Sequence, residues 1–284
     1  MLPSGNLAQR VITASVLAPL VILGILALPT QYFALGLAMV ALLGAWEWAG
    51  LAGWGSGRER FLYCLATAVL LYATSWASAL SPYEWSPLLV LALGWWCLAL
   101  VWVVGFERGS LIDWLERPTL RALVGWLILL PFWGALVAVH GRPETGPMLI
   151  ILLMILIWVA DSGAYFVGKR FGKRRLSPRT SPGKSWEGVM GGLLGVGLLS
   201  AGLGIYRQFS LEQVLILVAL SAGTVLLSIL GDVTESLFKR RIGVKDSGHL
   251  LPGHGGILDR IDSLTAAAPL FALAIQSGYI VPFS

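Results

Sequence analysis

The chain has 284 residues, of which 57% are hydrophobic and only 12% are charged, and its mean hydropathy is +0.79. This composition excludes an ordinary water-soluble domain and predicts a polytopic membrane protein. The formal net charge of +5 is better explained by basic loops that set membrane topology than by nucleic-acid binding. The two cysteines, Cys64 and Cys97, lie in apolar runs and show no metal-binding spacing.

Nine apolar segments follow one another along the chain, each about long enough to cross a bilayer as a helix. They cover approximately residues 11–29, 32–52, 61–80, 87–105, 120–140, 148–168, 188–206, 211–230 and 261–280. Turn-forming stretches such as "GWGSGRER" and "SPYEWSP" separate them. The first segment has no obvious small-residue cleavage site, so we expect an uncleaved helix. The sequence therefore predicts an all-α polytopic integral membrane protein with about nine transmembrane helices.

The distribution of basic residues predicts the orientation of these helices. With the N-terminus in the cytoplasm, eighteen of the twenty Lys and Arg residues lie on the cytoplasmic side, and only Arg142 and Arg207 lie outside. Nine crossings then place the C-terminus outside. We expect residues 1–140 to hold the first five helices, and residues 141–284 to hold four catalytic helices. Cytoplasmic loops are expected at 169–187 and 231–260.

Acidic residues are rare in this chain, and several fall within or close to apolar segments. Asp259 and Asp262 lie three apart at the predicted start of the last helix, near residue 257, so they share one face. Asp232 and Glu235 have the same spacing. Like charges near a low-dielectric boundary repel each other, and either a divalent cation or salt bridges to nearby arginines relieve this. From spacing alone, the two alternatives are equally expected.

The predicted loop after the sixth segment is strongly basic. Residues 169–184 carry seven cations and no acid, which is typical of a topology anchor or a patch for anionic lipid. The stretch "SPRTSPGKS" also suits an ordered loop that offers backbone N–H groups and a lysine to phosphate. Its end, Gly183-Lys184-Ser185, resembles the tail of a P-loop, but Pro178 stands where that pattern requires glycine.

The stretch "HGG", residues 254–256, precedes the last predicted helix. Two glycines there allow close backbone approach and free N–H groups at a helix N-terminus, which favours an anion. His254 could contact phosphate or carry a proton, or it could simply form hydrogen bonds within the loop. Asp161 is another acidic residue that lies within an apolar segment, the sixth.

Together these features favour metal-dependent phosphoryl or nucleotidyl transfer. A metal held by carboxylates neutralises the developing charge, while Lys and Arg hold the polyphosphate. An ion-coupled transporter would need the carboxylates but not a dense phosphate-suited loop. It would also favour paired Gly- or Pro-broken helices in matching halves, and no such pattern is seen.

Residues 236–262, "SLFKRRIGVKDSGHLLPGHGGILDRID", resemble the signature of the phosphatidate cytidylyltransferase (CDP-diacylglycerol synthase) family. The matching positions are Ser236, Lys239, Arg240, Lys245, Asp246, Gly248, Pro252, His254, Gly255, Gly256, Asp259, Arg260 and Asp262. The stretches "ADSGAYFVGKRFGK" and "SPGKSWEG" resemble two further family segments. In the second of these, Gly183 replaces one of two adjacent lysines that the family usually carries.

This resemblance implies an enzyme of phospholipid biosynthesis, a nucleotidyltransferase that makes CDP-diacylglycerol and pyrophosphate from CTP and phosphatidic acid. It implies a multi-pass protein of the inner (plasma) membrane with its active site facing the cytoplasm. It further implies Mg²⁺, a second, monovalent cation such as K⁺, and a homodimer. No covalent enzyme intermediate is required.

Carried over residue by residue, the resemblance assigns three groups of residues. The metal would be held by Asp232, Asp259 and Asp262. The catalytic residues would be these three with Lys245 and Asp246. The substrates would be bound by Asp161, Lys184, Ser185, Ser236, Lys239, Arg240, His254, Gly255, Gly256 and Arg260.

Two other enzyme classes use similar chemistry. The CDP-alcohol phosphotransferases have a pattern that begins with Asp-Gly, and no aspartate in this chain is followed by glycine. A CTP-dependent polyprenol or lipid kinase would use the same metal and phosphate groups, and only the long signature argues against it.

Overall fold

The computed structural model describes residues 4–78, 85–109, 117–250, 253 and 255–278. In these residues the chain forms nine α-helices and one two-stranded β-hairpin. The helices are α1 (Ser4–Ala27), α2 (Thr30–Ala52), α3 (Gly57–Ser78), α4 (Trp85–Glu107), α5 (Pro118–His140), α6 (Gly146–Phe171), α7 (Trp186–Tyr206), α8 (Leu211–Arg241) and α9 (Leu258–Gln276). The strands are β1 (Arg175–Ser177) and β2 (Ser181–Ser185).

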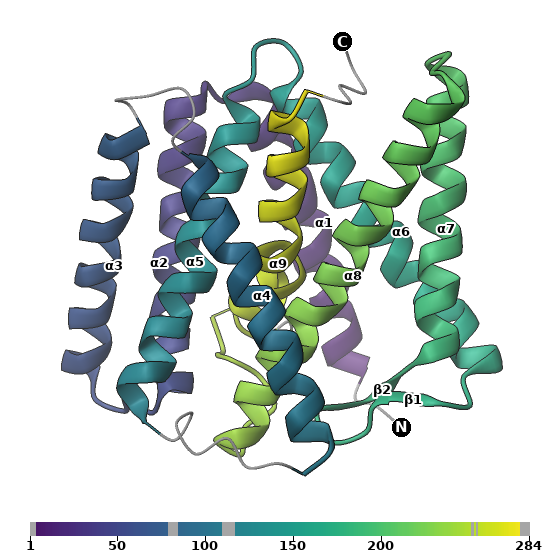
Figure 1. The fold of residues 1–284 in the computed structure, drawn as a ribbon. Helices are drawn as coiled ribbons and strands as arrows, with labels where there is room; N and C mark the ends of the chain where they lie inside the picture. The colour runs from purple at the N-terminus through teal and green to yellow at the C-terminus, as the bar shows by residue number, and fades with distance from the viewer. Residues whose placement is uncertain (1–3, 79–84, 110–116, 251–252, 254, 279–284) are drawn as a thin grey trace.

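The helices form one bundle with α9 near its middle (Figure 1). Helix α9 packs against α8, α5 and α4, while α6 packs along α7 and α7 along α8. Helix α3 lies at one edge of the bundle and packs against α2 and α5. The element at the centre is therefore the one that carries the end of the signature.

Within the described residues, each of the nine predicted apolar segments corresponds to one helix, which confirms the predicted fold class. Seven of the described helices, α2 to α8, are long and apolar enough to cross a membrane. Helix α9 has only 19 residues, and Asp259, Arg260 and Asp262 occupy its first two turns. It begins partway along the bundle and runs toward one end of it, whereas α1 begins at the other end (Figure 1). The crossing by α1 and α9, and the side that each terminus faces, stay predictions.

The structure corrects the two predicted cytoplasmic loops. Residues 231–241 are not loop but the last turns of α8, because the stretch "DVTESLFKRR" that follows Gly231 contains no proline or glycine to end the helix. In the other loop, α6 extends to Phe171 and the following chain pairs as an antiparallel hairpin. Arg175 lies opposite Ser185, and Ser177 lies opposite Ser181, with an irregularity between the two pairs. The fold is therefore helical with one short hairpin.

Helices α6 and α7 approach closely because glycines line their contact. A Cβ added to Gly163 would lie 2.7 Å from the Gly191 carbonyl oxygen, and one added to Gly192 would lie 2.8 Å from that of Ala160. Small residues of this kind let membrane helices pack backbone to backbone. This contact holds Asp161, between Ala160 and Gly163 on α6, at a fixed distance from α7.

One buried core joins the predicted segments 1–140 and 141–284. Trp48 of α2 is almost fully buried and packs against Phe238 of α8, with ring centroids 4.9 Å apart. The Trp48 indole N–H donates to the Arg121 carbonyl oxygen at 2.8 Å. These contacts bring the C-terminal half of α2 next to the elements that carry the signature.

Candidate active site

Three elements bring the signature residues together: the C-terminal half of α8, the hairpin and the first turns of α9. Helices α8 and α9 cross so closely at Gly231 that an added Cβ would collide with the Asp262 carbonyl oxygen. Asp232, the next residue on α8, is therefore held near the first two turns of α9. The predicted start of the last helix near residue 257 is confirmed, since α9 begins at Leu258.

Lys239 lies at the centre of a buried ionic cluster. Its ammonium nitrogen is 2.6 Å from the Asp259 carboxylate and 3.1 Å from that of Glu235. Lys239 and Glu235 are only 8% and 4% exposed. Buried charges are tolerated only when they are paired in this way. In the structure these two carboxylates therefore pair with a lysine of the signature.

The Asp259 carboxylate also orders the signature loop. Its second oxygen accepts hydrogen bonds from the backbone N–H groups of Ser247 at 3.0 Å and Gly256 at 2.8 Å. The glycine pair predicted an anion at this helix start, and the Gly256 N–H does donate to one. This anion is the Asp259 carboxylate of the chain itself. Binding of substrate phosphate by Gly255 and Gly256 stays a prediction.

A second ion pair joins the hairpin to α8. The Lys184 ammonium lies 2.6 Å from the Asp232 carboxylate, and both side chains are partly exposed. The Ser236 hydroxyl is 3.4 Å from the other Asp232 oxygen, a long contact. Because no acidic residue lies between Ser162 and Trp186, the partner of Lys184 could come only from another element.

Two more aspartates lie within electrostatic reach of this ion pair. Asp161 of α6 interacts with the charges of Lys184 and Asp232. Asp262 of α9 interacts with Asp232, Lys239 and Lys184, and its carboxylate accepts the Ser263 backbone N–H at 2.7 Å. The structure thus gathers four of the five predicted aspartates, Asp161, Asp232, Asp259 and Asp262, around two lysines.

The other predicted residues differ in what they contact. Ser185 is the N-cap of α7, where its hydroxyl accepts the Gly188 backbone N–H at 3.1 Å. The Arg240 side chain reaches the Thr180 carbonyl oxygen at 3.4 Å. Exposed side chains near the clusters are Lys245, Asp246 and Arg260. His254 lies outside the described residues.

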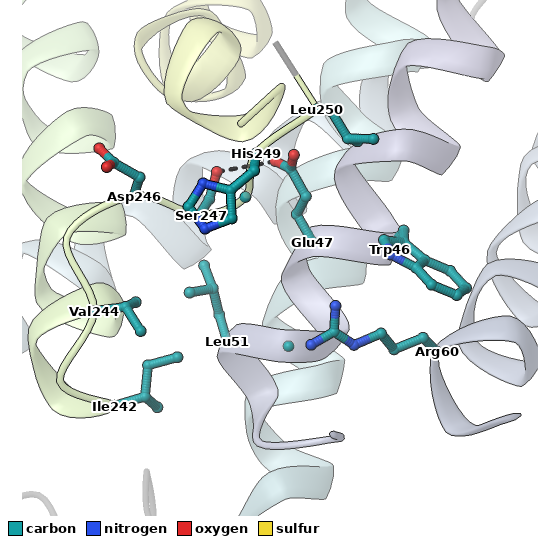
Figure 2. Close-up of a pocket in the computed structure, with 12 residues that line it drawn as sticks. Trp46, Glu47, Leu51, Arg60, Ile242, Val244, Asp246, Ser247, His249 and Leu250 are labelled. Carbon is teal, nitrogen blue, oxygen red and sulfur yellow. Dashed lines mark hydrogen bonds between the residues drawn. The ribbon is translucent and has the colours of Figure 1, made fainter. Parts of the chain in front are cut away.

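Sequence reasoning assigned no role to Glu47 of α2, which the structure places at the N-terminus of α9. Its carboxylate accepts the Ile257 and Leu258 backbone N–H groups at 3.0 and 2.9 Å. A cavity of about 440 Å³ lies beside it, between α2, the start of α3 and residues 242–250. Figure 2 shows Trp46, Arg60, Asp246 and His249 around this cavity. The only local signal was an acid placed between two tryptophans.

The donor set suits a hard cation, because it consists of carboxylate oxygens. Within the described residues, no group of three His, Cys, Asp or Glu side chains converges in the arrangement of a metal site. The ammonium groups of Lys184 and Lys239 are instead bound to Asp232 and Asp259. Both carboxylates therefore already bind one cationic group each, a lysine ammonium.

Comparison with known proteins adds independent evidence. Residues 8–277 match the family described as the Cytidylyltransferase family. A phosphatidate cytidylyltransferase of Pseudomonas aeruginosa is 49% identical over 266 residues, which cover 94% of this chain and 96% of that protein. Proteins of the same name from Haemophilus influenzae and Thermotoga maritima are 40% and 32% identical. The Haemophilus influenzae alignment covers 94% of this chain and 97% of that protein. The Thermotoga maritima alignment covers 93% of this chain and 94% of that protein.

Proposed function

This chain belongs to the cytidylyltransferase family, and from this we propose that it transfers the cytidylyl group of CTP to phosphatidic acid. The products are CDP-diacylglycerol and pyrophosphate, as required for phospholipid biosynthesis. One structural observation carries the proposal: the end of α8, the start of α9 and the hairpin lysine form two groups of paired carboxylates and ammonium groups, and Asp262 interacts with charges of both. Such a set suits a polyphosphate substrate.

The reaction needs positioning and charge compensation rather than a protein nucleophile. A phosphate oxygen of phosphatidic acid attacks the α-phosphorus of CTP, and the bond to the β-phosphate oxygen breaks to release pyrophosphate. Cationic side chains hold the phosphates in line and stabilise the negative charge on the leaving group. We assign this role to Lys184, Arg240, Lys245 and Arg260, all of which are at least partly exposed. Lys239 is buried between two carboxylates, which supports a role in orienting Asp259, and its predicted contact with substrate stays a prediction.

The carboxylates proposed to hold Mg²⁺ are Asp232, Asp259 and Asp262. Bound there, the ion would neutralise charge that develops on the transferred phosphoryl group. The crossing at Gly231 supports the pairing of Asp232 with Asp262. Asp259 already accepts three hydrogen bonds, out of about four that a carboxylate can accept, so it has room for one further partner.

The remaining parts of the proposal concern the setting of the enzyme. The basic residues support an active site that faces the cytoplasm. The bacterial relatives support placement in the inner membrane. A homodimer and a second, monovalent cation such as K⁺ are supported by the resemblance alone, and both stay predictions.

The test is conversion of labelled CTP by the purified protein in mixed micelles with phosphatidic acid. We expect a lipid product that carries cytidine, and Mg²⁺-dependent release of pyrophosphate. A lipid kinase would instead label the lipid from the γ-phosphate without cytidine, and a transporter would form no lipid product. Either result would overturn the proposal.

The variant Asp259→Asn tests the metal assignment. We expect a folded protein that forms no product, because asparagine keeps the shape of the side chain but removes the charge that Lys239 and the metal require. Substantial activity of this variant, purified away from any host enzyme, would remove Asp259 from the metal site.

A further inference from the structure

Glu47 is a buried acid on α2, far from the signature in the sequence. Its side chain is only 2% exposed, and both carboxylate oxygens accept hydrogen bonds. One oxygen accepts the Ile257 backbone N–H, and the other accepts the Leu258 backbone N–H and the Ser247 hydroxyl at 2.9 Å. Figure 2 shows Glu47 pointing from α2 toward Ser247 at the cavity wall. All three donors belong to the signature region.

Helix α9 depends on another element for its cap. Its N-cap residue, Ile257, has helical backbone angles and no side-chain capping hydrogen bond. The first N–H groups of a helix have no partner within the helix. A carboxylate at that end satisfies them and interacts favourably with the helix dipole. Glu47 supplies this carboxylate across the interface between α2 and α9.

Two glycines of the signature leave room for the Glu47 carboxylate. A Cβ added to Gly248 or to Gly256 would collide with its oxygen atoms. Neither glycine has the positive φ that would require glycine for backbone reasons. The absence of a side chain is therefore explained by the approach of Glu47 at Gly248, and by that of Glu47 together with the Ser247 hydroxyl at Gly256.

Glu47 is connected to Asp259 through two short paths. Ser247 donates its hydroxyl to Glu47 and its backbone N–H to Asp259. Leu258, whose N–H Glu47 also accepts, directly precedes Asp259 in the chain. Glu47 thus accepts hydrogen bonds from both ends of the segment from residue 247 to residue 258.

We propose that Glu47 is a positioning residue of the cytidylyl transfer, which holds the signature loop and the start of α9 so that Asp259 keeps its working orientation. This inference rests on the proposed function. It also gives α2, one of the N-terminal helices, a part in shaping the active site, since α2 supplies the residue that fixes the loop.

The first measurement is steady-state kinetics of Glu47→Gln, with CTP and phosphatidic acid varied independently. Glutamine keeps the shape of the Glu47 side chain but replaces one carboxylate oxygen with an NH₂ group. This group is a donor, so it cannot accept the backbone N–H that the oxygen accepts. We expect kcat to fall about tenfold or more, because misplacement of a reacting group lowers the chemical step, and both KM values to change less than about threefold. The control is Glu212→Gln, an exposed acid in the first turn of α8, which should match wild type.

The second measurement reports on the loop without activity. Lys245 is exposed in this loop, so trypsin can cleave after it when the loop loosens. We expect cleavage after Lys245, followed by mass spectrometry, to be about tenfold faster in Glu47→Gln than in wild type. Cleavage after Lys173, which is exposed near the hairpin, should keep its wild-type rate and so exclude general unfolding.

The outcomes separate the two proposals. If wild-type protein forms no cytidine-labelled lipid, the proposed function fails, while trypsin still decides whether Glu47 holds the loop. If wild type is active and Glu47→Gln keeps its kcat within about twofold with an unchanged cleavage rate, the role of Glu47 is refuted. Should Glu47→Gln fail to fold, Ser247→Ala removes one of the three hydrogen bonds and is judged by the same two measurements.

Discussion

At the scale of single residues, the two lysines of the site have different surroundings and should have different roles. Lys239 is 8% exposed and touches two carboxylates, so its removal would leave buried acids unpaired at a cost of about 3–5 kcal/mol. Lys184 is more open, with 27% of its side chain exposed, and has one acidic partner, Asp232. If Asp232 holds Mg²⁺ as proposed, the Lys184 ammonium would be available to the CTP polyphosphate.

Lys184→Ala distinguishes phosphate binding from a role in topology alone. The variant leaves six of the seven basic residues of the segment 169–184, so the topology should survive. Loss of one charge-assisted contact should lower kcat/KM for CTP by about one to two orders of magnitude. The apparent affinity for phosphatidic acid should change less.

The matched control for this prediction is Lys173→Ala, which removes an exposed charge near the same hairpin. It should leave the kinetics of both substrates unchanged. Equal kinetics for the two variants would restrict Lys184 to a topological role, and would move the nucleotide site toward Arg240 and Lys245.

At the scale of the elements, the hairpin is held by acidic side chains from the ends of two helices, α4 and α7. Glu107, at the end of α4, accepts the backbone N–H groups of Arg179 at 3.0 Å and Thr180 at 2.9 Å, and also the Thr180 hydroxyl. Glu187 accepts the backbone N–H groups of Lys173 and Arg174 at the base of the hairpin. The hairpin that carries Lys184 is thus anchored at its turn and at its base.

Glu107→Ala should loosen the hairpin turn, because three hydrogen bonds are lost at once. We expect the KM for CTP to rise about tenfold, and trypsin to cleave faster after Arg179, which is exposed. The control is Arg108→Ala, which changes the exposed residue directly after Glu107. A wild-type cleavage rate and KM in Glu107→Ala would show that the hairpin does not need this anchor.

At the scale of the whole molecule, the orientation in the membrane decides which compartment supplies the nucleotide. The hairpin lies at the end of the bundle where α1 begins (Figure 1). Both elements should therefore face the same side, and the count of basic residues predicts that this side is the cytoplasm. Gly183 suits a probe of this orientation, since it is exposed and an added Cβ would meet no atom within 4 Å.

Gly183→Cys, in a background without Cys64 and Cys97, should react only with thiol reagents that enter the cytoplasm. Membrane-impermeant reagents should label it in opened cells and not in intact ones. A cysteine at Ser177 would be a poor probe, because that position is buried. Labelling of Gly183→Cys from outside intact cells would reverse the topology and the placement of the site.

The sequence by itself determined the helical membrane fold, because long apolar runs must become helices to satisfy their backbone groups in lipid. It also determined the start of α9 near residue 257 and the family, since both depend on residues that are close together in the chain. The sequence predicts too early an end for α8. Charged residues such as Lys239 and Arg240 indicate a loop, although the helix continues through them.

Only the tertiary structure decided which groups meet. The partner of Lys184 is on α8, the acceptor for the hairpin turn is on α4, and the cap of α9 is Glu47 on α2. Periodicity and composition describe one segment at a time and contain no information about such pairings. The pairings arise when helices pack, because a buried charge or an unpaired N–H at a helix end must find its partner on whichever element lies beside it.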